Sequence, residues 1–338
     1  GTPTLVNAGT QNFCLINAPT FASVQFNETN IVWYDALTAG NLIPSTQALA
    51  SGTYYASISD SATGCESATR LAVVINVNDP GTPTLVNAGT QNFCLINAPT
   101  FASVQFNETN IVWYDAMTAG NLIPSTQALA SGTYYASISD PATGCESATR
   151  LAVVINVNDP GTPTLVNAGT QNFCLINAPT FASVQFNEAN IVWYDALTAG
   201  NLIPSTQALT NGTYFASISD PATGCESATR LSVTISVNDP GTPTLVNAGT
   251  QNFCLINAPT FASVQFNETN IVWYDALTAG NLIPSTQALA SGTYYASISD
   301  SATGCESATR LAVVINVNDP GTPTLVNAGT QNFCLINA

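Results

Sequence analysis

The sequence predicts an all-β chain built of tandem sandwich domains, and three observations lead to this prediction. The sequence repeats itself nearly unchanged every 80 residues. Within each copy, short runs of alternating apolar and polar residues are separated by turns rich in Gly, Pro and Asn, and no stretch has the periodicity of an amphipathic helix. About seven short runs fit into one copy, which is typical of a two-layered β-sandwich.

The repetition also predicts the domain organisation. Residues 1–80, 81–160, 161–240 and 241–320 are four near-copies, of which the first and fourth are identical. Residues 321–338 repeat the first 18 residues of a copy and are too few to enclose a core. We therefore expect four domains and the start of a fifth, as in a fragment of a longer array. Each boundary falls at Asp79-Pro80-Gly81 or its equivalent, which predicts a short, stiff connector.

The first copy is expected to supply its strands in a regular order. Residues 4–8 and 12–17 form short extended segments, and residues 20–26, 30–36 and 45–49 alternate as strands. Pro44 keeps residues 42–44 at a sheet edge, because proline has no N–H for a ladder. The clearest signal runs from Gly52 to Val77 and predicts two strands joined by a tight turn.

The third copy indicates which face of the last strand is buried. Three alternate positions of this strand become small and polar there, namely Ser232, Thr234 and Ser236. The intervening positions keep the residues of the first copy, which are Leu71, Val73, Ile75 and Val77. A strand with one face in a core and one in water tolerates polar substitution on the wet face. The Leu/Val/Ile/Val face is therefore predicted to be buried.

Composition and charge exclude several classes of function. The chain has 20 carboxylates, four arginines, no Lys and no His, which gives a net charge of −16. Such a surface repels nucleic acid and anionic membranes. No apolar stretch approaches the roughly 20 residues of a membrane span. Without His or Lys a Ser or Cys nucleophile has no ordinary base, so we expect no enzymatic activity and no cofactor.

Calcium binding at the junctions between copies is an alternative role for Asp79. Calcium takes about six to eight oxygen ligands with several carboxylates, and each junction offers one Asp. We therefore prefer a turn-capping role for Asp79.

The nine cysteines fall at two fixed positions of the copy. The first set is Cys14, Cys94, Cys174, Cys254 and Cys334, and the second is Cys65, Cys145, Cys225 and Cys305. No CxxC pair or histidine accompanies them, which argues against zinc. Two cysteines per small domain predict one structural disulfide each, in an oxidising compartment. We prefer the pairing Cys14–Cys65 within a copy, and the pairing Cys65–Cys94 remains open.

Three side chains of each copy are candidates for surface contacts. Trp33 alternates with Ile31 and is assigned to the core, whereas Tyr34 and Tyr55 lie on the polar sides of their strands. These tyrosines could stack on glycans or pack on a neighbouring chain. Arg70 follows Glu66 by four residues, which predicts a surface ion pair. Arg70 is otherwise a candidate for a lateral contact between chains.

Trp33 on a middle strand, followed by Gly52-x-Tyr54 on a late strand, resembles the immunoglobulin-like sandwich, with Tyr54 in the tyrosine-corner position. Ala56 stands where the usual inter-sheet cysteine would be. The segments WYDA, PSTQAL, SGTYYAS and GCES resemble the Ig-like repeats of large Bacteroidota surface proteins, typically exported by type IX secretion and associated with gliding or adhesion. Ser61 and Ser301 lie in Asp-Ser-Ala segments that resemble a Bacteroidota O-glycosylation site; Pro141 and Pro221 replace them in the middle copies.

The resemblance implies a structural or adhesive array that forms a stiff stalk or filament on the cell surface. Its expected partners are the neighbouring repeats and, through lateral self-association, other chains. The alternative is a multivalent glycan-binding array attached to a larger secreted protein. Both hypotheses place the chain outside the cell.

Overall fold

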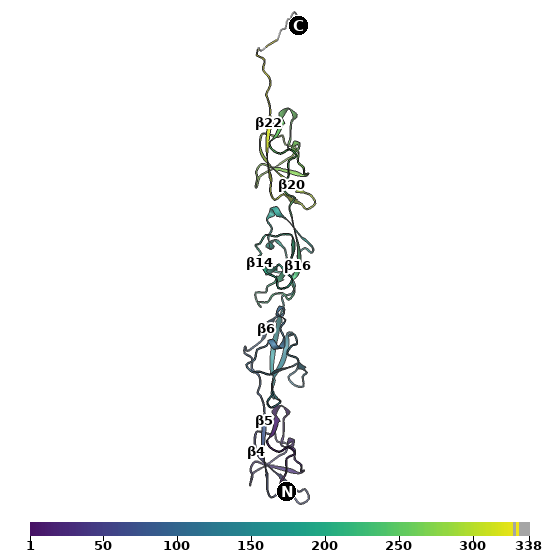
Figure 1. Ribbon diagram of the computed structural model, residues 1–338. Helices are drawn as coiled ribbons and strands as arrows, with labels where there is room; N and C mark the ends of the chain where they lie inside the picture. Colours follow the sequence, from purple (N-terminus) through teal and green to yellow (C-terminus); the bar gives the residue numbers. More distant parts are fainter. Residues whose placement is uncertain (327–328, 331–338) are drawn as a thin grey trace. The chain divides into compact units, whose positions relative to one another are not determined.

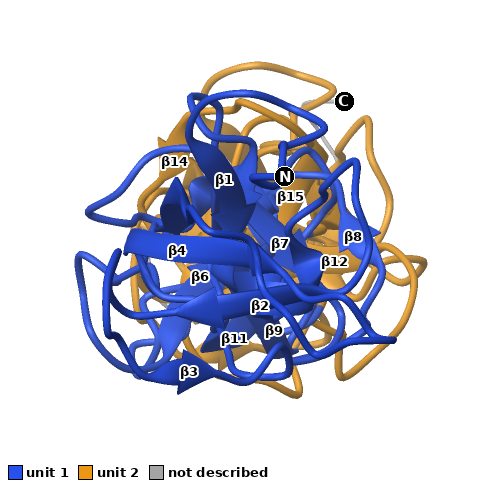
Figure 2. Ribbon diagram, turned by 90° about the horizontal axis from the view of Figure 1, so that it is seen from below, with its two compact units in different colours: residues 1–161, 220–228 blue, residues 162–219, 229–338 orange. Residues whose placement is uncertain are grey.

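The computed structural model describes residues 1–326 and 329–330 and divides the chain into two compact units (Figure 2). The first unit comprises residues 1–161 and 220–228, and the second comprises residues 162–219 and those from 229 onward. Residues 327–328 and 331–338, which include Cys334 and most of the expected fifth copy, lie outside the described residues.

The first copy forms one five-stranded sheet in the order β1-β5-β4-β2-β3. Two of its strands, β4 and β5, are labelled in Figure 1. Its strands are β1 (Gln11–Cys14), β2 (Ile31–Tyr34), β3 (Leu42–Ile43), β4 (Gly52–Ile58) and β5 (Leu71–Asn78). β1 runs parallel to β5, and the other pairs are antiparallel. β3 is an edge strand, as Pro44 predicts.

The other three copies repeat this order. The second contains β6 (Gln91–Cys94), β7 (Ile111–Tyr114), β8 (Leu122–Ile123), β9 (Gly132–Asp140), β10 (Cys145–Glu146) and β11 (Leu151–Asn158). The third contains β12 (Gln171–Cys174), β13 (Ile191–Tyr194), β14 (Leu202–Ile203), β15 (Gly212–Ile218) and β16 (Leu231–Asn238). The fourth contains β17 (Gln251–Cys254), β18 (Ile271–Tyr274), β19 (Leu282–Ile283), β20 (Gly292–Asp300), β21 (Cys305–Glu306) and β22 (Leu311–Asn318).

Two short 3-10 turns precede β2 and its equivalent in each copy. They are η1 (Leu15–Asn17) and η2 (Phe21–Ser23), then η3 (Leu95–Asn97) and η4 (Phe101–Ser103), η5 (Leu175–Asn177) and η6 (Phe181–Ser183), and η7 (Leu255–Asn257) and η8 (Phe261–Ser263). No α-helix occurs in the described residues, and none of their helical segments has the length and apolar character needed to cross a membrane. The all-β prediction is confirmed.

The second layer of each sandwich is less regular than predicted. The strands expected at residues 20–26 and 45–49 reduce to isolated bridges, Leu5 with Phe26 and Thr20 with Ala48. The prediction of about seven strands per copy is therefore too high, since the copies have five or six. The reason lies in Thr20 and Ser23, which bond reciprocally as a capping box and turn the chain into η2. This turn buries Phe21 to 1% exposure.

The core lies between these layers. It contains Phe21, Val24, Trp33, Ile43, Leu49, Ala56, Val73 and Ile75, with the same positions buried in every copy. Trp33 meets Phe21 and Phe26 edge to face, at ring-centroid distances of 5.1 and 5.5 Å. Its predicted core position is confirmed. On β5, Val73 and Ile75 are buried whereas Val74 is 47% exposed, which confirms the predicted faces.

The tight turn expected between β4 and β5 is wrong. β4 ends at Ile58 and β5 begins at Leu71, so residues 59–70 form a longer connection. Within it the chain folds back on itself, with a bridge between Ser59 and Glu66 and a hydrogen bond from Asp60 N to Cys65 O of 2.8 Å. We call residues 60–68 the cysteine hairpin, together with 140–148, 220–228 and 300–308 in the later copies.

Candidate functional site: the junction between successive copies

Three disulfides join successive copies of the repeat. They are Cys14–Cys145, Cys94–Cys225 and Cys174–Cys305, each with a sequence separation of 131. The Cα–Cα distances are 5.2, 5.3 and 5.3 Å, within the usual range for a disulfide. Each bridge ties the end of the first strand of one copy to the cysteine hairpin of the next. Cys65 and Cys254 are exposed free thiols.

Both pairings considered from the sequence, Cys14–Cys65 and Cys65–Cys94, are therefore wrong, as are the disulfides assigned to Cys65 and Cys254. Cys14 lies beside Asn78, at the far end of β5, whereas Cys65 precedes the start of this strand at Leu71. An eight-residue strand spans about 25 Å, too far for a disulfide between the two ends. Cys94 likewise lies at the far end of β11, beside Asn158. The structure thus has one disulfide at each junction between copies, whereas the sequence analysis expected one disulfide within each domain.

Asp79 connects the linker to the cysteine hairpin of the following copy. Its Oδ1 accepts hydrogen bonds from Gly81 N at 3.1 Å and from Ala148 N at 3.0 Å. Asp159 with Ala228 and Asp239 with Ala308 repeat the second contact. One carboxylate oxygen thus caps the linker turn, as the sequence predicts, and also holds the hairpin.

The receiving surface of a junction comprises Cys14, η1 and Asp79, with the equivalent residues in later copies. Ile16, Ile96 and Ile176, in the middle of η1, η3 and η5, are 39–40% exposed, whereas Ile256 in η7 is 92% exposed. On the other side of the junction, Cys145, Cys225 and Cys305 are each only 2% exposed. The exposed fractions of these side chains therefore show what an occupied junction covers. It buries the cysteine of the hairpin and covers about half of the isoleucine side chain.

A serine of the cysteine hairpin anchors the linker within its own copy. Ser147 Oγ donates to Gly81 O at 2.5 Å and accepts from Ile138 N at 2.8 Å. In the first copy, Ser67 Oγ instead pairs with Ser57 Oγ at 2.7 Å. The hydroxyl therefore exchanges partners between the two copies, and its bond to Gly81 fixes the entry of the chain into the second domain.

Tyr34 and Arg70 form a second cluster, at the base of each cysteine hairpin. The Arg70 guanidinium lies 3.3 Å from the centroid of the Tyr34 ring, and its Nη1 donates to Ala36 O at 2.8 Å. The Tyr34 hydroxyl donates to Glu66 Oε1 at 2.5 Å. Tyr34 thus lies between Arg70 and Glu66, the two groups expected to form an ion pair. The stacked cation and the hydrogen bond tie the hairpin to β2.

The same contacts raise the pKa of this tyrosine above its ordinary value. For Tyr34 the largest cause is the hydrogen bond to the Glu66 carboxylate, followed by burial. For Tyr114 and Tyr274 burial is the largest cause, and the carboxylate comes second. Tyr34 is therefore partly covered by its own copy, and one face of its ring carries Arg70. Tyr55 is its half-buried register partner on β4.

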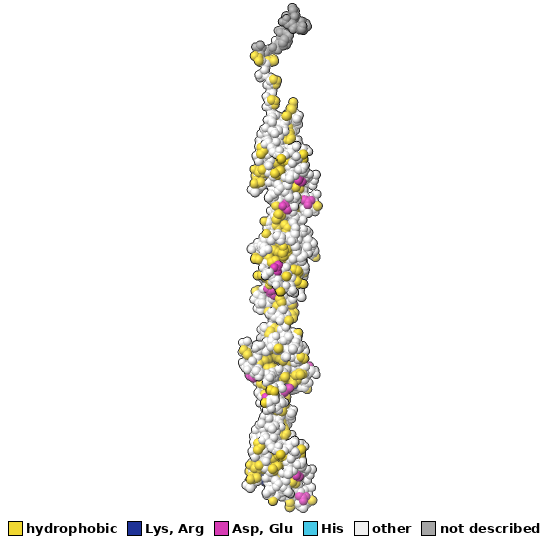
Figure 3. All heavy atoms as spheres, viewed as in Figure 1, with side chains coloured by type: hydrophobic (Ala, Val, Ile, Leu, Met, Phe, Trp, Pro, Cys, Tyr) yellow, Lys and Arg dark blue, Asp and Glu magenta, His cyan; other side chains and the backbone are white. Residues whose placement is uncertain are grey.

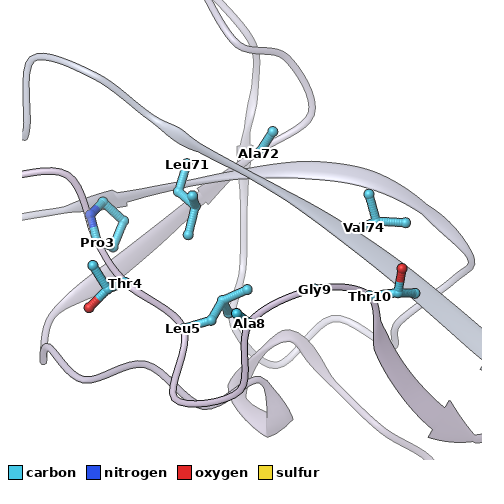
Figure 4. Close-up of a pocket in the computed structure, with 9 residues that line it drawn as sticks. All are labelled: Pro3, Thr4, Leu5, Ala8, Gly9, Thr10, Leu71, Ala72 and Val74. Carbon is cyan, nitrogen blue, oxygen red and sulfur yellow. The ribbon is translucent and has the colours of Figure 1, made fainter.

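A shallow hollow beside β5 recurs on several copies. In the first copy it has a volume of about 470 Å³ and is lined by Pro3, Thr4, Leu5, Ala8, Gly9, Thr10, Leu71, Ala72 and Val74 (Figure 4). The second and fourth copies have the same hollow. Its lining contains no ionisable side chain, so it lacks the groups for acid–base chemistry. The face of the molecule seen in Figure 3 shows scattered apolar side chains and few charges.

Metal ligands are likewise not brought together. Within residues 1–326 and 329–330, no three His, Cys, Asp or Glu side chains form a group that could hold a metal ion. The predicted modification sites Ser61 and Ser301 are both exposed, at the tips of cysteine hairpins.

Four domains with this sheet order and a buried tryptophan define the chain as a tandem array of immunoglobulin-like sandwiches. The family described as "Ig-like domain CHU_C associated" matches residues 1–78, 80–158, 160–238 and 240–319. The chain belongs to this family.

No curated protein matches the chain. Among solved structures, it is similar to the N-terminal four Ig domains of Dscam1 isoform 9.44, with 12% identity over 94% of this chain and 99% of that chain, at a TM-score of 0.17. It is also similar to Sidekick-1 immunoglobulin domains 1–5, with 14% identity over 94% and 78% of the two chains, at a TM-score of 0.17. Drosophila N-cadherin EC1-4 shows 10% identity over 92% and 99%, at a TM-score of 0.19.

Tryptic digestion in denaturant without reductant tests the disulfide pairing. Trypsin cleaves after Arg70, Arg150, Arg230 and Arg310. Because each bridge spans one of the first three cuts, we expect residues 1–310 to remain one covalent species until a reductant separates the fragments. Pairing within copies, as in Cys14–Cys65, would release separate fragments without reduction. Mass spectrometry after alkylation distinguishes the two results.

Proposed function

We propose that this chain is an extracellular structural array, with an adhesive role at the cell surface, whose domains are coupled by disulfides that carry tension from one copy to the next. The observation that supports this best is the overlap of the bridges. The Cys94–Cys225 bridge starts inside the span of Cys14–Cys145 and ends inside the span of Cys174–Cys305. Every copy is therefore tied to its neighbours by a disulfide as well as by the linker.

The composition and the family support the same role. Near-identical copies make the number of domains more important than any single binding site, and disulfides persist in oxidising, extracellular compartments. The resemblance to Bacteroidota surface repeats supports a role on a bacterial cell surface, as a stalk or filament with domain boundaries near residues 80, 160 and 240. Glycosylation at Ser61 and Ser301 would add bulk at exposed hairpin tips.

The glycan-binding alternative has weaker support. A sugar-stacking tyrosine needs a free ring face, and Arg70 occupies one face of Tyr34. The same stacking recurs in all four copies. Arg70 Nη1 also donates a hydrogen bond to Ala36 O. This donor is therefore already used within the domain and is not free for a lateral contact between chains.

Surface labelling of intact source cells tests the proposed function. We expect an antibody raised against the chain to label unpermeabilised cells. After alkylation without reduction, Cys14 and Cys145 of the labelled protein should stay unmodified, because they are paired. Labelling that requires permeabilisation, or free Cys14 thiols in the native protein, would contradict an extracellular, disulfide-coupled array. An antibody against a cytoplasmic protein serves as the control for cell integrity.

A further inference from the structure

Both cysteines of an interior copy are held in place by their own copy. In the second copy, Cys94 ends β6, where its register partner on β11 is Asn158. Cys145 begins β10 and pairs with Asp140 of β9. The Asp140 carboxylate closes this turn, since its Oδ2 accepts from the Thr143 hydroxyl at 2.7 Å. The backbone of one copy therefore positions both cysteines without a disulfide inside that copy.

The two cysteines held in this way cannot bond to each other. Cys94 lies at the far end of β11, and Cys145 precedes the start of this strand, so the strand length of about 25 Å lies between them. A disulfide needs two Cα atoms within about 7 Å. The folded copy thus excludes Cys94–Cys145, and the junctions instead join Cys145 to Cys14 and Cys94 to Cys225.

An unfolded chain favours other pairs. Cys145 lies about 30 positions before Cys174 and about 50 after Cys94, but 131 after its partner Cys14. The probability of closing a flexible loop falls with roughly the 1.5 power of its length. For Cys145 in an unfolded chain, Cys174 is therefore favoured about tenfold over Cys14, and Cys94 about fourfold. Oxidation before folding would give mostly pairs that the structure does not contain.

The core of each copy is complete without the bridges. In the second copy it is built around Phe101, Trp113 and Val153, and all its members come from that copy. The core of the third copy is likewise formed by its own residues. No disulfide closes a loop within a copy, so each core can form while the cysteines are reduced.

We infer that the bridges form after the copies have folded, by oxidation of the folded, reduced chain. Folding then selects the pairing, because only the folded junction brings the correct cysteines together. This gives the oxidation a place in the maturation of the chain. An oxidation that acts on the unfolded chain must be followed by disulfide exchange, which breaks the pairs favoured by short loops.

The oxidation needs an electron acceptor, for which we take a small-molecule disulfide such as oxidised glutathione. The Cys94 thiolate attacks this disulfide, which forms a mixed disulfide and releases one small thiol. The Cys225 thiolate then attacks the Cys94 sulfur, which forms the Cys94–Cys225 bond and releases the second small thiol. Two protein thiols are oxidised, and one small disulfide is reduced to two thiols.

Cleavage without reductant identifies the partner of Cys145. Met117 is the single methionine of the chain, so trypsin followed by cyanogen bromide releases residues 118–150, in which Cys145 is the single cysteine. A Cys65→Ser background leaves Cys14 as the single cysteine of residues 1–70. The fragment joined to residues 118–150 reports the pairing, namely residues 1–70 for Cys14, residues 71–117 for Cys94 and residues 151–230 for Cys174.

The reduced chain is treated with oxidised glutathione in native buffer and, separately, in denaturant, and is then alkylated and cleaved. In native buffer we expect residues 118–150 to be joined to residues 1–70 at least about tenfold more often than to either other fragment. In denaturant we expect residues 151–230 to exceed residues 1–70 about tenfold. Other pairs as the main product in native buffer, or residues 1–70 as the main partner in denaturant, would overturn the inference.

Adjacent valines of β11 provide a matched test without denaturant. Val153 is 1% exposed, whereas Val154 is 48% exposed. Val153→Asp places an unpaired carboxylate in the core and should unfold the second copy, which loss of hydrogen-exchange protection around Met117 verifies. We expect Cys145 to lose Cys14 as its main partner in this variant, whereas Val154→Asp keeps the native pairing. The same pairing in both variants would contradict selection by folding.

Discussion

Reducing the three disulfides between copies should raise the maximum length to which the chain can be pulled about fourfold. When both ends are pulled, tension follows the shortest covalent path. This path runs through residues 1–14, crosses to residues 145–174, and crosses again to residues 305–338. It holds about 80 residues and extends to about 270 Å, whereas the reduced chain of 338 residues extends to about 1,200 Å.

Single-molecule pulling with handles at both ends measures this difference. In the oxidised chain we expect no contour-length step above roughly 120 Å, since no segment of the path exceeds 34 residues. After reduction, each copy should unfold separately with a step of roughly 250 Å. Steps of the longer size in the oxidised chain would show that the bridges do not shield the domains.

Two cysteine variants serve as matched controls for the pulling experiment. Cys65→Ser removes a free thiol and should leave the limit unchanged. Cys145→Ser opens the first bridge, so the shortest path must pass through Cys94–Cys225 and back along the third copy to Cys174. It then holds about 180 residues, and the limit should rise to about 630 Å. The contrast between two serine substitutions at equivalent positions isolates the effect of the bridge.

The second large effect is expected from Trp113→Ala. Trp113 is 2% exposed and packs between Phe101 and Phe106, at centroid distances of 5.1 and 5.5 Å. Truncating a buried tryptophan costs about 3–5 kcal/mol, a large share of the stability of so small a domain. We expect the second copy to melt on the order of 20 °C lower, while the other copies keep their transitions.

Hydrogen exchange with mass spectrometry locates this effect. The second copy is suited to it because Met117 distinguishes its peptides from those of the other copies. Peptides around Met117 should lose protection in Trp113→Ala, whereas those of the third copy should keep it. Leu122→Ala, at a 62% exposed position of β8, is the control and should change stability by no more than about 0.5 kcal/mol. Equal loss of protection in both variants would contradict the assigned core.

Much of the fold was accessible from sequence because its signals are local. Alternation of side chains along residues 71–77 predicts which face is buried, and the polar substitutions of the third copy identify that face. Trp33 was assigned to the core for the same reason. The regular strands predicted at residues 20–26 and 45–49 were wrong. In the first of them, side-chain capping by Thr20 and Ser23 competes locally with the sheet.

The contacts at the junction between copies could be predicted less well from the sequence. The sequence shows Asp79 in a turn, but its second contact, to Ala148 N, comes from 69 residues away. The spacing in the sequence pairs Glu66 with Arg70, but only the packing of β2 against the cysteine hairpin brings Tyr34 to both of them. In the sequence both cysteines of a copy precede its last strand, and only the parallel pairing of β1 with β5 places Cys14 at the far end of that strand from Cys65.

The all-β class, the 80-residue period, the tryptophan core and the lack of a base for ordinary nucleophilic catalysis all follow from the order of residues in the chain. The cysteine pairing depends on the three-dimensional fold. A disulfide needs two Cα atoms within about 7 Å, and separation along the chain does not measure that distance. Here 131 residues separate partners that lie 5.2–5.3 Å apart, because β5 and its equivalents carry the chain from one end of a domain to the other. The cysteine hairpin of each later copy thereby meets the preceding copy instead of its own first strand.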